Sequence, residues 1–248
     1  MSTRDRSFIL SGELYAAAKV GSKLEYFFFG NCSSLRVEPQ ENRIALRDYT
    51  QPGGGNRNVV NRVTDVNINM TVHDLIPEVL QIAVRGITKD NAIEEIEDQE
   101  ITVGDSAMIP LGKFADPTTI VVEKDGNPEP FVAGVDYEPG FGSITILEGG
   151  AIAKGNKLKV SYDTLPHTSV EALTSSGGRF AFMLRGRNEA QGGKAVNAYF
   201  HNASLGLSGL DFIAGDDFGE IQIEGELLSD ASITAADESR FFKLEMAD

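Results

Sequence analysis

Residues 65–72 show the clearest alternation of apolar and polar side chains in the chain. The apolar members are Val66, Ile68, Met70 and Val72, and the polar members are Asp65, Asn67, Asn69 and Thr71. Strict alternation of this kind is typical of a β-strand that packs on one face and contacts water on the other. We therefore expect a half-buried strand at residues 65–72.

Several other short segments are rich in β-branched residues and are bounded by turn-forming residues, which predicts further strands. They cover residues 43–47, 118–122, 143–147, 157–162, 179–184, 195–200 and 220–228. The last segment carries a second polar row, which comprises Glu220, Gln222, Glu224 and Glu226. Glycine is also above its usual share, at 26 of 248 residues, which fits many tight turns. The pattern predicts a mainly β fold.

A glycine-rich segment separates the strands predicted at 43–47 and 65–72, and it is typical of a long, flexible hairpin tip. Its residues include Asp48, Tyr49, Gln51, Pro52, Gly53, Gly54, Gly55, Asn56, Arg57 and Asn58. A simple turn needs fewer residues, and long loops in ordered domains tend to be functional. We therefore treat this tip as a candidate functional segment.

One amphipathic helix is expected from Asp74 to Arg85. Asp74 suits an N-cap, Pro77 falls in the first turn, and Gly86 follows as a C-cap. The apolar stripe should pack on a sheet through Leu75, Val79, Leu80 and Ala83.

Charge is distributed unevenly along the chain, which has a formal net charge of −15. Residues 1–88 carry 10 basic and 9 acidic side chains (+1), residues 89–165 carry 6 and 15 (−9), and residues 166–248 carry 6 and 13 (−7). The acidic middle third indicates an inserted β-rich domain at 98–164, within a discontinuous domain made of 1–97 and 165–248. So acidic a chain is also a poor candidate for binding duplex DNA through its phosphates.

Candidate chemistry is sparse. Cys32 is the only cysteine, so no intramolecular disulfide is possible, and His73, His167 and His201 lack metal-ligand spacing. Gly53–Gly55 is not followed by the Lys-Ser/Thr of a phosphate loop, and the aspartates near Gly215 lack EF-hand spacing. We expect no catalytic residue, no metal and no cofactor, and hence no enzyme. No apolar run is long enough for a signal peptide or a membrane span, so we expect a soluble chain without membrane insertion.

Several segments together resemble the phage tail tube (major tail protein) family. The opening residues 11–15 and 29–35, the hairpin at 41–72 and the helix ending at Gly86 follow the order and spacing of that family. Residues 131–138 are similar to part of a β insertion found in some members, and residues 218–225 resemble the closing strand.

The resemblance implies an antiparallel β-sandwich or barrel with one flanking α-helix, and an Ig-like insertion on the outside. It also implies a virion protein, made in the host cytoplasm, whose hexameric rings stack head-to-tail into the hollow tail tube. Its partners would be other copies of itself, tape-measure and tail-terminator or tip proteins, and genomic DNA that passes through without specific binding.

Within that family the hairpin tip would reach the adjacent ring. At least one of the two polar rows would line the channel, as a surface without cationic partners. Alternatively, both rows face outer solvent. Two other functions remain open: a tube protein of a contractile injection or secretion system, and a carbohydrate-binding or adhesive β-domain, which the absence of Trp disfavours.

Overall fold

The computed structural model describes residues 6–19 and 24–247, and it confirms a mainly β fold with antiparallel sheets. The described residues contain one α-helix, α1 (Pro77–Ala83), and one short 3₁₀ turn, η1 (Glu189–Gln191). The chain divides into two compact units, of which unit 1 comprises Met1–Thr88 and Val170–Asp248, and unit 2 comprises Lys89–Ser169. No helix in the described part of the chain is long and apolar enough to cross a membrane.

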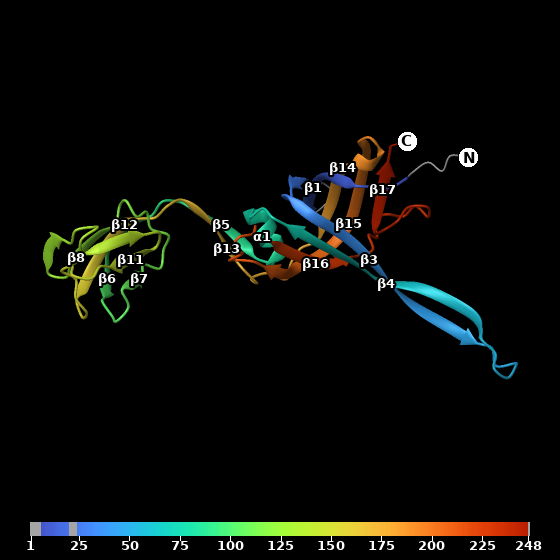
Figure 1. The fold of residues 1–248 in the computed structure, drawn as a ribbon, viewed down its shortest axis with the longest axis horizontal. Helices are drawn as coiled ribbons and strands as arrows, with labels where there is room; N and C mark the ends of the chain where they lie inside the picture. The colour runs from blue at the N-terminus through green and yellow to red at the C-terminus, as the bar shows by residue number, and fades with distance from the viewer. Residues whose placement is uncertain (1–5, 20–23, 248) are drawn as a thin grey trace. The chain divides into compact units, whose positions relative to one another are not determined.

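Unit 1 is built on one eight-stranded sheet (Figure 1). Its strands lie in the order β2 (Phe27–Phe28), β1 (Leu10–Ala18), β14 (Phe180–Asn188), β15 (Lys194–Leu210), β16 (Ile221–Leu227), β4 (Asn56–Val72) and β3 (Cys32–Arg47), while β17 (Phe242–Met246) pairs with β15. Three of these strands, β3, β4 and β15, are far longer than the segments that the sequence pattern predicts.

The core of unit 1 lies on one face of this sheet. The four apolar residues of the predicted strand at 65–72 are all buried there. They join a cluster that includes Leu14, Phe29, Phe182 and Ile223, in which the rings of Phe29 and Phe182 meet edge to face at 5.2 Å. Helix α1 contributes Val79, Ile82 and Ala83 to the same cluster.

Helix α1 is shorter than predicted at both ends. It begins at Pro77, because the carboxylate of Asp74 does not cap it and instead accepts a hydrogen bond from the Asn31 amide at 2.9 Å. Leu75 therefore lies before the helix and is 73% exposed, so it does not pack on the sheet, and Leu80 is only half-buried. At the other end the helix stops at Ala83, and Arg85, with φ of 50°, takes the left-handed conformation that often ends a helix, one residue before the predicted C-cap Gly86.

A glycine is required at position 86 for a different reason, because the backbone of Glu171 passes close to it. A Cβ atom at this position would lie 2.6 Å from the carbonyl oxygen of Glu171. The segment that follows Glu171 runs along the end of the helix, where the Leu173 amide donates to the Val84 carbonyl at 2.9 Å.

Unit 2 consists of two small sheets that share one core. The first has the order β6 (Glu95–Thr102), β12 (Lys157–Asp163), β8 (Val121–Lys124) and β9 (Asn127–Pro130), and the second has β10 (Tyr137–Gly140), β11 (Ser143–Ile146) and β7 (Met108–Pro110). Buried residues from both sheets, such as Val122, Ile144 and Leu158, form one hydrophobic cluster.

The bounds of unit 2 differ from the insertion predicted at 98–164. The unit runs from Lys89 to Ser169, and the predicted start would cut through β6, which pairs with β12 from Glu95 to Thr102. The chain passes between the units through the two-stranded ribbon of β5 (Ile87–Asn91) and β13 (His167–Glu171).

Candidate functional site

The two polar rows predicted from the sequence lie side by side on one sheet face. Strand β16 pairs with β4 so that Gln222 lies opposite Thr71, Glu224 opposite Asn69, and Glu226 opposite Asn67. Residues with the same alternation on paired strands project to the same side of a sheet. We call this surface the polar face. Asp65 continues it at one end and Glu220 at the other.

Strand β3 extends the polar face, which the sequence pattern did not reveal. Leu35 and Val37 are half-buried against the core, so the alternate residues of β3 point to the polar side. Ser34 Oγ donates to Thr71 Oγ1 at 3.0 Å, and Asn69 Nδ2 donates to Glu38 Oε2 at 3.3 Å. The short apolar spacing Leu35–Val37 is the only sequence signal for this strand.

The polar face also carries cations, contrary to the expected absence of cationic partners. Arg36 forms an ion pair with Glu38 at 2.7 Å and lies opposite Asn69. Arg85 reaches the far edge of the face, where its Nε donates to the Leu205 carbonyl at 3.1 Å.

Gly206 of β15 makes room for the Arg85 side chain, because a Cβ there would lie 3.1 Å from Arg85 Nη2. Arg85 also lines a shallow hollow of about 380 Å³ on this face. The other lining residues are Asn67, Asn69, Ser204, Glu224, Gly225 and Glu226. The polar face thus carries two guanidinium groups, those of Arg36 and Arg85, and five carboxylates, so its net charge is −3. The carboxylates are those of Glu38, Asp65, Glu220, Glu224 and Glu226.

Beyond the polar face, β3 and β4 continue as a two-stranded ribbon that projects from the rest of unit 1 (Figure 1). We call residues 41–64 the arm. A β-bulge between Gln40 and Glu41 marks the point where the ribbon leaves the sheet. Every residue of the arm is exposed except Asp48 and Gly54, which are half-buried.

The tip of the arm is shorter than the predicted segment. The strands extend to Arg47 and resume at Asn56, so Asn56, Arg57 and Asn58 belong to β4. The Asp48 amide donates to the Gly55 carbonyl at 2.8 Å and closes the loop. Hydrogen bonds from the Thr50 hydroxyl (2.5 Å) and the Thr50 amide (2.9 Å) to Asp48 Oδ1 lower the pKa of this carboxyl.

The arm combines exposed apolar side chains with unpaired positive charge. Its exposed apolar residues are Ile44, Leu46, Tyr49, Val59, Val60 and Val63. Its charged residues are Arg43, Arg47, Arg57 and Arg62 against Glu41 and Asp48, a net of +2. None of the four arginines has an ion-pair partner within the part of the chain that the structure describes.

A larger pocket of about 1060 Å³ lies elsewhere in unit 1, between the end of β1, strand β17 and the segment 230–239. Tyr26, Tyr199 and Phe242 contribute aromatic walls. Lys19 and Asp230 form an ion pair at its border. Burial alone would raise the pKa of Asp230, but the hydrogen bonds from Lys19 and Ser232 outweigh it and lower the pKa to about 2.

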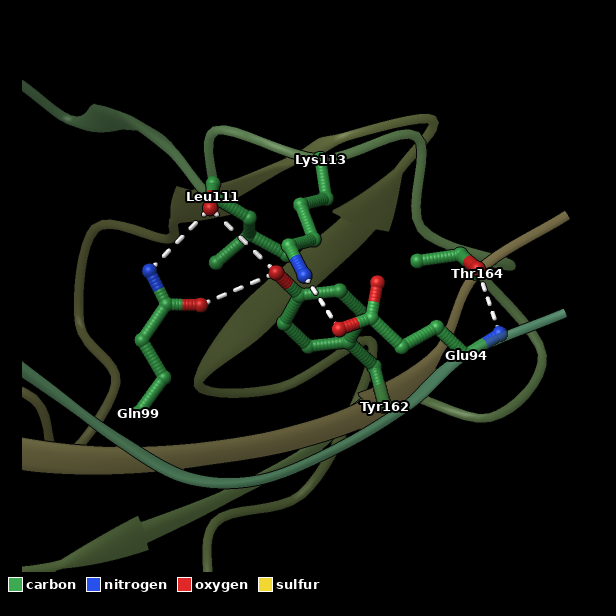
Figure 2. Close-up of polar contacts among 6 residues, drawn as sticks. All are labelled: Glu94, Gln99, Leu111, Lys113, Tyr162 and Thr164. Carbon is green, nitrogen blue, oxygen red and sulfur yellow. Dashed lines mark hydrogen bonds and ion pairs between the residues drawn. The ribbon is translucent and has the colours of Figure 1, made fainter. Parts of the chain in front are cut away.

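Unit 2 contains a compact polar network around Tyr162 (Figure 2). The Tyr162 hydroxyl lies 2.9 Å from Gln99 Oε1 and 3.2 Å from the Leu111 carbonyl oxygen, which also accepts from Gln99 Nε2 at 3.1 Å. Lys113 pairs with Glu94 at 2.6 Å. These contacts join β6 and β12 to the adjoining residues 94, 111–113 and 164, all within unit 2, so they serve to hold the unit together.

The fold and surfaces thus define a mainly β protein of two units, with an acidic sheet face and an exposed basic arm. The chain belongs to the family described as "Protein of unknown function UCP028589", whose model matches residues 7–245. No curated protein matches the sequence. Among the described residues, no group of three or more His, Cys, Asp and Glu side chains is placed to hold a metal ion.

Proposed function

We propose that this protein is a structural subunit of a phage tail tube, which assembles six to a ring and stacks its rings head-to-tail around a channel for the genome. The exposed arm is the observation that carries the proposal. Among the residues that the structure describes, no third strand or core packs on the arm, although apolar side chains lie on both of its faces.

An isolated two-stranded ribbon is only marginally stable in water, and exposed apolar surface of this extent marks an interaction site. Contact with a neighbouring copy would cover these side chains and hold the ribbon. Because the arm projects from one end of the sheet, the contact it makes is directional, and a directional contact that repeats without closing builds a filament.

The acidic polar face suits the wall of such a channel. Negative charge repels nucleic acid phosphates, and repetition around a ring strengthens the field. Under this proposal DNA passes along Glu224, Glu226 and their neighbours without being retained. Tape-measure and tail-terminator or tip proteins would be partners of the assembled tube in the virion.

Negative-stain electron microscopy of the purified full chain tests the proposal, and we expect rings or tubes. A variant in which a two-residue turn replaces Glu41–Thr64 should fold and form rings that do not stack, because it lacks the arm. Monodisperse single chains at high protein concentration would contradict the proposal. A tube protein of a contractile injection or secretion system would also give tubes.

The aromatic pocket bordered by Tyr26, Tyr199 and Phe242 favours a second candidate, a carbohydrate-binding or adhesive domain. Aromatic walls with a few polar groups are typical of small-ligand sites. This candidate predicts single particles in the microscope and saturable binding on a glycan array, which Tyr199→Ala would abolish.

A further inference from the structure

The loop between β15 and β16, residues 211–220, exposes apolar side chains to an unusual degree. Phe212 is 88% exposed, Ile213 93% and Phe218 84%. Asp211, Asp216, Asp217 and Glu220 surround them, and none of these has an ion-pair partner among the described residues. We call this segment the acidic loop. Nothing in the described chain covers its apolar side chains.

The strand register places the acidic loop and the arm at opposite ends of the same sheet. Strand β4 runs from Asn56 at the tip of the arm to Val72, and Val72 lies opposite Ile221, the first residue of β16. The acidic loop immediately precedes Ile221, so it lies at the Val72 end. At about 3.3 Å per residue, roughly 50 Å of strand separates this end from the arm tip.

We propose that, when copies of this chain stack, the arm of one copy docks on the acidic loop of the next. This inference rests on the tube function proposed above, and it names the surface that receives the arm. The two surfaces complement each other, because one has four unpaired arginines among apolar side chains and the other has four unpaired carboxylates among apolar side chains.

The same arrangement disfavours contacts between two arms or between two acidic loops. Two arms brought together would oppose like positive charges, and two acidic loops would oppose like negative charges. Of these three contacts, arm to arm, loop to loop and arm to loop, only the last pairs opposite charges. A contact between two different surfaces at opposite ends of a subunit is heterologous, so it propagates into a filament and does not close as a dimer.

Charge exchange tests this pairing in the full chain. The arm variant Arg47→Glu/Arg57→Glu and the loop variant Asp216→Lys/Asp217→Lys should each lose tubes, as judged by negative-stain microscopy and by pelleting. The variant that carries all four changes should regain tubes. Far-UV circular dichroism and thermal unfolding establish that each variant is folded.

Mixing supplies a second readout. The arm variant has a net negative arm and an unaltered acidic loop, whereas the loop variant has an unaltered basic arm and a loop in which the two new lysines balance Asp211 and Glu220. Neither should form tubes alone, but an equimolar mixture should form tubes that contain both. Lys124→Glu/Lys157→Glu in unit 2 alters net charge as much as the arm variant does, and tubes should persist in it.

The outcomes separate this inference from the proposed function. If the unaltered chain forms neither rings nor tubes, the proposed function fails. In the other case the unaltered chain forms tubes while the arm or loop variant also forms them, or while neither the four-change variant nor the mixture regains them. Either result means that the arm docks elsewhere, and it overturns only this inference.

Discussion

The ion pair between Lys19 and Asp230 illustrates how much a single contact contributes to the stability of unit 1. Asp230 is buried, and besides Lys19 it accepts hydrogen bonds from the Ser232 amide (3.0 Å) and hydroxyl (2.7 Å). The Lys19–Asp230 pair connects the segment before β17 to the end of β1, and the Ser232 bonds hold the Asp230 carboxylate in place within that segment. A lone histidine, His201, lies in the same pocket, and burial lowers its pKa.

We expect Asp230→Asn to lower the free energy of unfolding by about 2 kcal/mol at pH 7, because the folded state holds the pKa of Asp230 near 2 and the unfolded state near 3.8. A lowered pKa stabilises the fold above the unfolded value, and this contribution is lost as the pH falls through about 2. The difference between wild type and variant, measured by urea unfolding, should therefore shrink between pH 4 and pH 2.

Asp237→Asn is the matched control, since Asp237 is exposed and lies on the same segment. It should leave the unfolding free energy unchanged within ~0.5 kcal/mol. An equal loss in Asp230→Asn at pH 7 and at pH 2 would show that the carboxylate charge is not the cause.

At the scale of the elements, the long strands are stabilised by pairing with neighbouring strands, and the local sequence does not show which strands these are. Residues 203–210 of β15 include Gly206 and Gly209, which are weak strand formers, yet both pair with residues of β16. A bulge opposite Phe180–Phe182 shifts the buried side of β15, so that Phe200 and then Ala203 point to the core.

Gly225 in β16 provides a test of this close strand packing. A Cβ there would lie 2.1 Å from the Ser204 carbonyl oxygen and 2.9 Å from Leu205 Cδ2. We expect Gly225→Ala to lower the unfolding free energy by about 1–3 kcal/mol, because two paired strands must separate to admit the methyl group. Thermal or urea unfolding measures this loss.

Gly55→Ala at the arm tip is the companion variant, because a Cβ there meets nothing within 4 Å and Gly55 has no positive φ. It should leave stability unchanged or raise it by about 0.4–1 kcal/mol. Equal effects of the two substitutions would show that the β15–β16 contact is looser than the structure indicates.

At the scale of the whole molecule, the charge divides according to the two units. Unit 2 contains 6 basic and 15 acidic residues, a net of −9, which leaves −6 for unit 1. Since the arm carries +2, the remainder of unit 1 carries −8. The first third of the sequence is therefore near neutral in sum, although it contains the basic arm, and the rest of unit 1 is acidic.

We expect removal of Lys89–Ser169, with Thr88 joined to Val170 by a short Gly-Ser turn, to leave a folded unit 1 that still forms tubes. The two hydrophobic cores share no residue, so the deletion should not open the core of unit 1. Circular dichroism reports folding and microscopy reports tubes of smaller outer diameter. A folded variant that forms no rings would place unit 2 in the contact between subunits.

The sequence alone indicated the mainly β class, the strand at 65–72, the presence of one helix and the acidic insertion. These features depend on local periodicity, on Pro and Gly positions and on composition, which are properties of neighbouring residues. The same reasoning placed the start of the helix at Asp74, because an N-cap signal cannot show that the carboxylate is already bound to the Asn31 amide.

Only the tertiary structure decided which surfaces come together. The rows at 65–71 and 220–226 are more than 140 residues apart in sequence, and strand register places them on one face. The first part of β3, residues 32–40, lies next to them and has little local sequence signal. Register likewise puts the basic arm and the acidic loop at opposite ends of the sheet. Long-range pairing depends on the sum of many cross-strand contacts, and no local pattern records that sum.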